Sequence, residues 1–158
     1  MIAEQPTGRD QAFKATIKLP YQPGVLKAVG VDAEGHEKDT RMLRTAGAVS
    51  QISITADVQV LKANGQDLAF VTVELVDQNG QRDPNASNSI FFEIEGQGQI
   101  LATDNGSIKD ETPYISHERN AWKGRAMAVV RTTTQSGKIL VRAKSAGLPD
   151  ATIVLKSK

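Results

Sequence analysis

The sequence predicts an all-β fold, an immunoglobulin-like β-sandwich preceded by a partial β-sandwich module. Short segments in which apolar and polar residues alternate recur along the chain, as they do in half-buried strands. Turn-forming pairs such as Asn-Gly and Pro-Gly separate these segments. No stretch shows the 3.6-residue period of an amphipathic helix, so the strands are expected to pack sheet on sheet.

The clearest strand lies within residues 64–80, between two Asn-Gly turn signals. Its residues at alternate positions are compact or β-branched, which suits the inner face of a sandwich. The opposite row is mixed and includes Phe70 and Glu74, so only one face of this strand is expected to be fully buried. The predicted inner row is Ala69, Val71, Val73 and Leu75.

The first 46 residues predict a smaller module. Phe13, Ala15, Ile17 and Leu19 alternate with polar residues, which predicts a strand over 13–19, and further strands are expected at 25–31 and 38–45. A three-strand meander can bury only one side. Residues 1–46 are therefore expected to be the closing strands of a truncated immunoglobulin-like module, and 47–158 a complete sandwich, with 46–48 (Ala-Gly-Ala) as the linker.

Five further strands are expected in the second domain. Ile90, Phe92 and Ile94 should face inward, with Phe91, Glu93 and Glu95 outward. The segment 125–132 is apolar in both phases, which predicts a central strand covered on both faces. Residues 107–123 have no periodicity and are expected to form the longest loop. The remaining strands are expected at 100–103, 139–144 and 151–155.

The composition excludes several classes of partner and site. The chain has 19 Lys plus Arg against 18 Asp plus Glu, so no charge excess would attract nucleic acid or an anionic membrane surface. It has no cysteine, which excludes disulfides and thiolate metal sites. No apolar run approaches the roughly 20 residues of a membrane span, and no targeting signal is present. No cofactor is expected.

Four segments of the chain resemble parts of one family of bacterial enzymes. The segment PYQPGVLKAVGVDAEGHEKDTRMLRTAG (20–47) resembles the closing strands of an immunoglobulin-like module found towards the C-terminus of β-galactosidases of glycoside hydrolase family 2. The segments NGQDLAFVTVELVDQNG, FFEIEGQGQILATDNG and AWKGRAMAVVRTT resemble the immunoglobulin-like domain that follows it. The first of these three is also similar to strands of bacterial surface and invasin-type domains. The resemblance implies a non-catalytic tail of a periplasmic or secreted glycosidase, whose other domains, the catalytic one included, would be its partners.

The residues themselves offer no catalytic pair. Glycoside hydrolysis needs two carboxylates held across one scissile bond. Glu93 and Glu95 are two residues apart on one strand, which points them the same way, and they are interpreted as solvated. His36 and His117 fall in separate modules, so they predict no common metal centre. The oxygen ligands around Asp104 and Asp110 match no dedicated calcium loop, and turn formation explains them without an ion.

The nearest approach to a binding constellation lies in and beside the predicted loop, which gathers Tyr114, His117, Arg119, Asn120 and Trp122. An indole ring with amide and imidazole groups nearby could stack on a sugar and bind its hydroxyls. The same ring could instead close the end of the sandwich or pack on a neighbouring module. The candidate sugar or interdomain contact residues are Asp104, Asn105, Tyr114, His117 and Trp122.

Three functions follow as hypotheses. The first is a structural accessory segment of a family 2 glycosidase, making interdomain or subunit contacts. The second is a carbohydrate-binding module that works through the Trp122 loop, and the third is an immunoglobulin-like domain of a bacterial adhesin. The apolar side chains of residues 12–45 exceed what a three-strand meander can cover, so this segment is expected to pack on the second domain or to self-associate with another copy.

Overall fold

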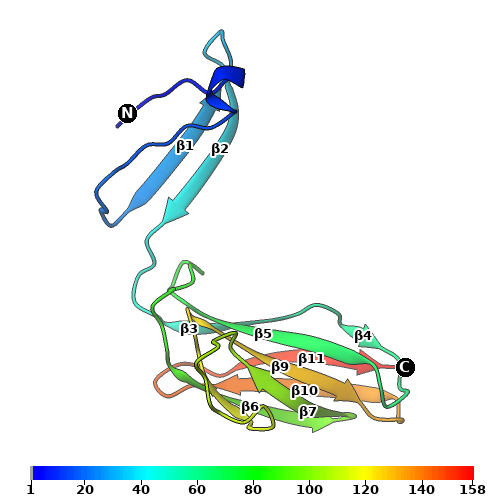
Figure 1. The fold of residues 1–158 in the computed structure, drawn as a ribbon. Helices are drawn as coiled ribbons and strands as arrows, with labels where there is room; N and C mark the ends of the chain where they lie inside the picture. Colours follow the sequence, from blue (N-terminus) through cyan, green and yellow to red (C-terminus); the bar gives the residue numbers. More distant parts are fainter. Residues whose placement is uncertain (1) are drawn as a thin grey trace. The chain divides into compact units, whose positions relative to one another are not determined.

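The computed structural model describes residues 2–158, and the chain divides into two compact units, Met1–Arg44 and Thr45–Lys158 (Figure 1). The described residues are almost entirely strand and loop, which confirms the all-β prediction. One short 3₁₀ helix, η1 (Arg9–Gln11), is the exception. None of the described helices could cross a lipid bilayer.

The first unit is a two-stranded antiparallel ribbon with a lead-in segment. Its strands are β1 (Val25–Val31) and β2 (Glu37–Arg44), and Leu26 lies directly opposite Leu43 across the ribbon. None of the described residues 2–44 is buried, so this part of the unit has no hydrophobic core of its own. Its exposed apolar side chains include Phe13, Ile17, Leu26, Val29, Met42 and Leu43.

The prediction of a strand over residues 13–19 is wrong. These residues form no strand, and the ribbon has two strands where the sequence predicted three. Ala12 and Phe13 have left-handed backbone conformations, with φ of 51° and 57°, which turns the chain away from an extended path. An alternating pattern forms a strand only where it can pair with a neighbour, and residues 13–19 have no ladder partner here.

The second unit is a sandwich of two sheets, which confirms the predicted fold class (Figure 1). The four-stranded sheet has the order β3-β5-β9-β7, and the five-stranded sheet the order β4-β11-β10-β6-β8. Without the short edge strands β4 and β8, this is the strand arrangement of a seven-stranded immunoglobulin constant-type domain. The strands are β3 (Gln51–Ala56), β4 (Val60–Leu61), β5 (Leu68–Val76), β6 (Ser89–Gly96), β7 (Gly98–Asp104), β8 (Glu118–Asn120), β9 (Arg125–Thr132), β10 (Gly137–Lys144) and β11 (Ala151–Ser157).

The core forms between the inner rows of the two sheets. The predicted inner row of β5 is confirmed, because its four members, from Ala69 to Leu75, are completely buried. Ile90 and Phe92 of β6 are buried as predicted, while Phe91 faces outward and is 43% exposed. The rest of the apolar core comes mainly from inward residues of β9, β10 and β11: Ala126, Ala128, Val130, Ile139, Val141, Ala143 and Leu155.

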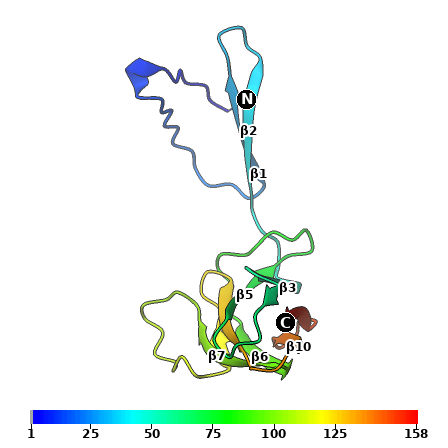
Figure 2. The same ribbon diagram turned by 90° about the vertical axis from the view of Figure 1, so that its right-hand side faces the viewer.

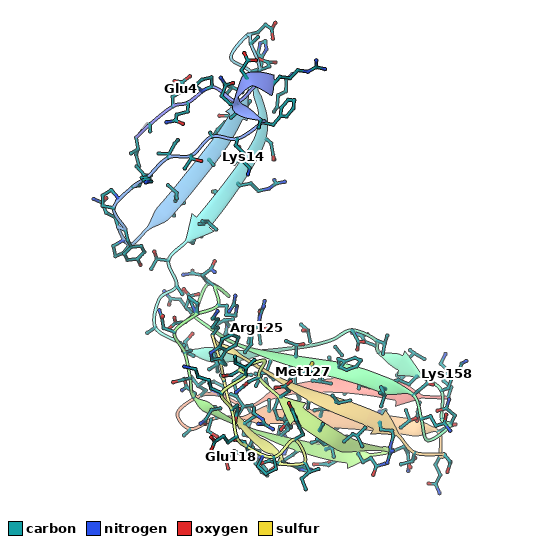
Figure 3. All side chains as sticks on the ribbon, viewed as in Figure 1. Glu4, Lys14, Glu118, Arg125, Met127 and Lys158 are labelled. Atoms are coloured by element: carbon teal, nitrogen blue, oxygen red, sulfur yellow. The ribbon has the colours of Figure 1, made fainter. Side chains whose placement is uncertain are left out.

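The prediction that β9 is covered on both faces is wrong. The strand is central, since it pairs with both β5 and β7, but its buried residues alternate with half-buried ones. Met127, which is labelled in Figure 3, and Val129 alternate with the buried residues and therefore lie on the outer face of the four-stranded sheet, which no second layer of this unit covers. Apolar residues are common in the exposed row of a strand. Apolar residues in both rows therefore do not by themselves show that both faces are covered.

The burial pattern makes a direct prediction for two apolar side chains. Leu75→Ala should lower the free energy of unfolding of the second unit by about 2–5 kcal/mol, because it removes a fully buried side chain and leaves a cavity. Phe91→Ala is the control and should cost much less, since that side chain faces outward and is already 43% exposed. Urea denaturation of the two variants measures both values. The opposite order would mean that the inward and outward rows are assigned to the wrong faces.

Candidate functional site

The candidate residues lie in the segment from Asp104 to Trp122, which leaves β7, forms β8 and returns to β9. Figure 2 shows this yellow-green segment looping out beside β6 and β7. The sequence predicted an unstructured loop over 107–123. That prediction is wrong for Glu118–Asn120, which pairs with β6 as strand β8. The pairing places Arg119 directly opposite Ile90, on the inward side of the sheet.

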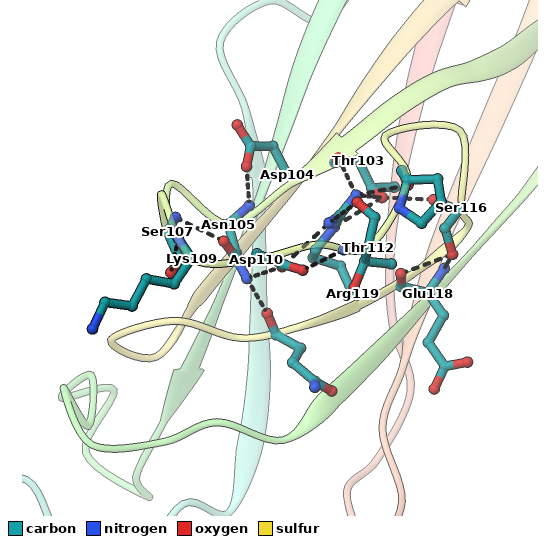
Figure 4. Close-up of polar contacts among 12 residues, drawn as sticks. Thr103, Asp104, Asn105, Ser107, Lys109, Asp110, Thr112, Ser116, Glu118 and Arg119 are labelled. Carbon is teal, nitrogen blue, oxygen red and sulfur yellow. Dashed lines mark hydrogen bonds and ion pairs between the residues drawn. The ribbon is translucent and has the colours of Figure 1, made fainter.

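Arg119 is the centre of this segment. Its side chain is 1% exposed, and its guanidinium group donates to three backbone carbonyls (Figure 4). Nη2 donates to the carbonyl oxygens of Thr103 and Pro113 at 2.7 and 2.9 Å, and Nη1 donates to that of Thr112 at 2.8 Å. Buried cations are retained only when they are hydrogen-bonded and paired, and both conditions are met here. The guanidinium therefore joins the end of β7 to the middle of the loop.

Asp110 supplies the opposite charge. Its Oδ2 lies 3.2 Å from Arg119 Nη1 and accepts a hydrogen bond from Asn105 Nδ2 at 2.5 Å. Its Oδ1 accepts one from the backbone N–H of Thr112 at 2.9 Å. Hydrogen bonds from Thr112, assisted by the Arg119 charge, lower the pKa of Asp110 from 3.8 to about 2. The carboxylate is thus held in its charged form by the groups that fold the loop.

Asp104, Asn105 and Trp122 come together at one end of the segment. Asp104 Oδ1 accepts from the backbone N–H groups of Asn105 and Gly106, and Asn105 Nδ2 donates to the carbonyl of Asn120. The Trp122 ring lies against Gly106, remains 42% exposed, and has the Lys123 ammonium 4.4 Å from its centre. This arrangement is a turn beside a half-exposed indole whose ring also contacts a cation.

Tyr114 and His117 have different neighbours. The Tyr114 ring is 65% exposed and lies 5.8 Å from the Arg119 guanidinium carbon. The His117 ring lies 6.5 Å from the outward-facing ring of Phe91, and its carbonyl accepts from the N–H of Phe92. None of these contacts of Tyr114 and His117 involves Asp104, Asn105 or Trp122. The five candidates therefore form no single constellation around one ligand.

A tight turn from Trp122 to Arg125 positions the indole ring of Trp122. Trp122 and Arg125 exchange backbone hydrogen bonds at 2.8 and 3.1 Å, and the two residues between them have positive φ. Gly124 is required there, because a Cβ would overlap the carbonyl oxygen of Asp83. Arg82 Nη1 donates to the carbonyl of Lys123, which fixes the turn from its other side.

The carboxylates outside this segment are engaged individually. Glu93 was interpreted as solvated, but it is half-buried and pairs with Lys144 at 2.7 Å and Arg142 at 3.4 Å. Its hydrogen bond with Lys144 lowers the pKa of Glu93. Glu95 is exposed on the same strand. Two carboxylates on one strand face do not lie across a bond from each other, so they cannot act as a hydrolytic pair.

One cluster of metal-ligating groups occurs among the described residues, in the β1–β2 hairpin. Ligand atoms of Asp32, Glu34 and His36 lie within 4.8 Å of one another. The ammonium of Lys38 already lies 2.9 Å from Asp32 Oδ2, and Asp32 Oδ1 accepts from two backbone N–H groups. These contacts, led by Lys38, lower the pKa of Asp32 and account for its charge without an ion.

A shallow depression lies on the outer face of the five-stranded sheet. It is lined by Phe91, Ser89 and Glu118, and by Lys144, Ser145 and Ala146. Ser89 Oγ donates to Glu118 Oε1 at 2.6 Å, so these two polar groups satisfy each other.

The sequence matches the family "Glycoside hydrolase family 2 C-terminal domain 5" over residues 52–154. The chain is 30% identical to the β-galactosidase BoGH2A of Bacteroides ovatus over 141 residues, which are 89% of this chain and 16% of that protein. It is 28% identical to a β-glucuronidase of Formosa agariphila, covering 88% of this chain and 14% of that protein. The chain thus spans a small part of these relatives.

A solved structure of a glycosyl hydrolase family 2 member from Bacteroides cellulosilyticus has the same fold. It superposes with a TM-score of 0.91 at 35% identity, and the match covers 98% of this chain and 20% of that one. The immunoglobulin-like sandwich and the ribbon that precedes it therefore occur together in a family 2 protein.

The low pKa of Asp110 predicts how the free energy of unfolding depends on pH. Because its folded pKa is about 2 and its unfolded value is near 4, its stabilising contribution is present above about pH 4 and is lost as the pH falls to about 2. Asp110→Asn has no such titration, so its free energy of unfolding should fall less than that of the wild type between about pH 5 and pH 2. Urea denaturation at several pH values measures the difference. Equal losses in the two proteins would contradict the low pKa of Asp110 and the contacts with Thr112 and Arg119 that explain it.

Proposed function

The chain belongs to the glycoside hydrolase family 2 C-terminal domain 5 family, and on this basis we propose that it is a non-catalytic accessory segment of a β-galactosidase- or β-glucuronidase-type glycosidase. Its role is to support the parent enzyme and to contact its other domains or subunits. One observation carries the proposal. The long loop uses its polar groups to fold itself around Arg119 and leaves aromatic rings, Tyr114 and Trp122, on its outside.

The internal hydrogen bonding of the loop argues against catalysis and for contact. The Asp110 carboxylate is committed to Arg119, Asn105 and Thr112, so it has no role left as an acid or a base. A loop held rigid by a buried cation presents its exposed rings at little entropic cost, which is what a protein interface requires. Aromatic residues are enriched in such interfaces.

Carbohydrate binding at the same loop is the second candidate, and the exposure of Trp122 is the observation that favours it. The Lys123 ammonium, however, lies over this ring and competes with a sugar for its face. The candidates His117 and Tyr114 are engaged elsewhere, which leaves few hydroxyl-binding groups beside the indole. The names of the relatives favour a glycosidase over an adhesin. A periplasmic or secreted location for the parent enzyme belongs to the same proposal.

The two units would serve this role differently. In this proposal residues 47–158 are a complete sandwich. Residues 1–46 are the closing strands of a module, and other segments of the parent enzyme complete it. The exposed Leu26–Leu43 pair on the ribbon supports this, because an apolar sheet face of this kind is normally covered. In the absence of the parent, a second copy of the chain would cover residues 12–45.

A comparison of two contexts tests the contact role. In the full-length parent enzyme, Trp122→Ala should lower the stability of the assembled protein by roughly 2 kcal/mol or more, as loss of a central interface aromatic does. In the isolated chain the same change should cost no more than Phe91→Ala, since the two rings are 42% and 43% exposed. Thermal and urea denaturation of both proteins provide the measurements.

Two outcomes would contradict the proposal. An equal, small effect of Trp122→Ala in both contexts would remove Trp122 from any interdomain contact. Saturable quenching of the fluorescence of Trp122, the single tryptophan, by galactosides or glucuronides would favour the carbohydrate-binding alternative. As a control for the non-catalytic assignment, the isolated chain should not hydrolyse nitrophenyl galactoside or glucuronide.

A further inference from the structure

Asp77 is an almost completely buried carboxylate at the point where the chain enters the second unit. It follows β5 directly and is 3% exposed. Its Oδ1 accepts from the backbone N–H groups of Asn79 and Gln81, at 2.8 and 2.9 Å, which closes the turn after β5. Its Oδ2 accepts from the backbone N–H of Gly47 at 2.8 Å, thirty residues away in the sequence. The Gly47 N–H is the main cause that lowers the pKa of Asp77.

The residues after Gly47 are also attached to the sandwich. Val49 packs against the hydrophobic core. The Ser50 N–H donates to the carbonyl of Val76 at 2.9 Å, and the Gln51 side-chain amide donates to the carbonyl of Asp77 at 3.2 Å. The chain from Gly47 onward is therefore part of the folded second unit, although its Ala-Gly-Ala sequence predicts a linker.

The close approach depends on the residue types at both ends. A Cβ on Gly47 would lie 3.3 Å from Asp77 Oδ2, closer than such contacts normally are, so glycine gives the carboxylate access to the N–H. An ionised carboxylate has two acceptor oxygens, and Asp77 uses one in each direction. Asparagine has one acceptor oxygen and could satisfy either the turn or Gly47, but not both.

We propose that Asp77 is a linker clamp, a conformational device that fixes residues 47–50 to the sandwich, so that these residues do not act as a flexible connection to the preceding unit. Residues held to the sandwich in this way cannot contribute the freedom of a flexible linker. The clamp rests on contacts within the second unit, and it holds whether or not the parent protein is a glycosidase.

Hydrogen exchange tests the clamp in the unmodified chain. A hydrogen bond to a buried charged acceptor should slow exchange of the Gly47 amide by roughly tenfold to a hundredfold relative to an unstructured glycine. Exchange of that amide at the unstructured rate, in a chain whose β5 amides are protected, would overturn the proposal. This measurement does not depend on any variant folding.

A pair of substitutions tests the need for two acceptor oxygens. Asp77→Asn should remove the protection of Gly47, or of Asn79 and Gln81. Where Gly47 loses its protection, tryptic cleavage after Arg44 should become about tenfold faster. Asp83→Asn is the matched control, because the Asp83 carboxylate accepts from one backbone N–H, that of Asn85, and asparagine can still do so. The control should leave the Gly47 amide and the Arg44 cleavage rate unchanged. An Asp77→Asn protein that folds and retains protection at all three amides would overturn the proposal.

Discussion

The second unit depends on the packing of two inner strand rows against each other. With no cysteine in the chain, its stability rests on apolar burial between β5 and β9 on one side and β6 and β10 on the other. Two buried charged side chains, those of Arg119 and Asp77, are positioned by these strands. Arg119 is placed by pairing with Ile90 of β6, and Asp77 follows the last residue of β5. The loop and the linker are therefore held in place by charged groups that a packed core positions.

The strands of that core could be predicted because their pattern is local. The period of two in β5 places Leu75 inside, and the same argument places Phe91 outside. Three features could not be predicted in this way. Strand β8 has three residues, too few for a pattern, and Arg119 lies in a polar stretch where a buried residue gives no signal. The alternation over 13–19 predicts a strand that has no partner, because pairing is a property of the whole fold.

The candidate site shows the same limit. The sequence grouped five residues by proximity along the loop, whereas the structure divides them between a turn beside Trp122, the guanidinium of Arg119 and the Phe91 ring. Likewise, the small residues 46–48 are typical of a flexible linker, yet a carboxylate thirty residues later binds Gly47. Arg119 and Asp77 both bind backbone groups outside their own strand or turn, and such partners leave no periodic trace in the sequence.

The two units differ most in what covers their apolar side chains, and hydrogen exchange on the dilute, monomeric chain measures that difference directly. We expect amides of β5, β9 and β10 to exchange only through global unfolding, and amides from Phe13 to Leu19 and in β1 and β2 to exchange rapidly, since none of the described residues 2–44 is buried. Strong protection over Phe13–Leu19 in a monomer would contradict the account. It would mean that the first unit is stable without the rest of a parent enzyme.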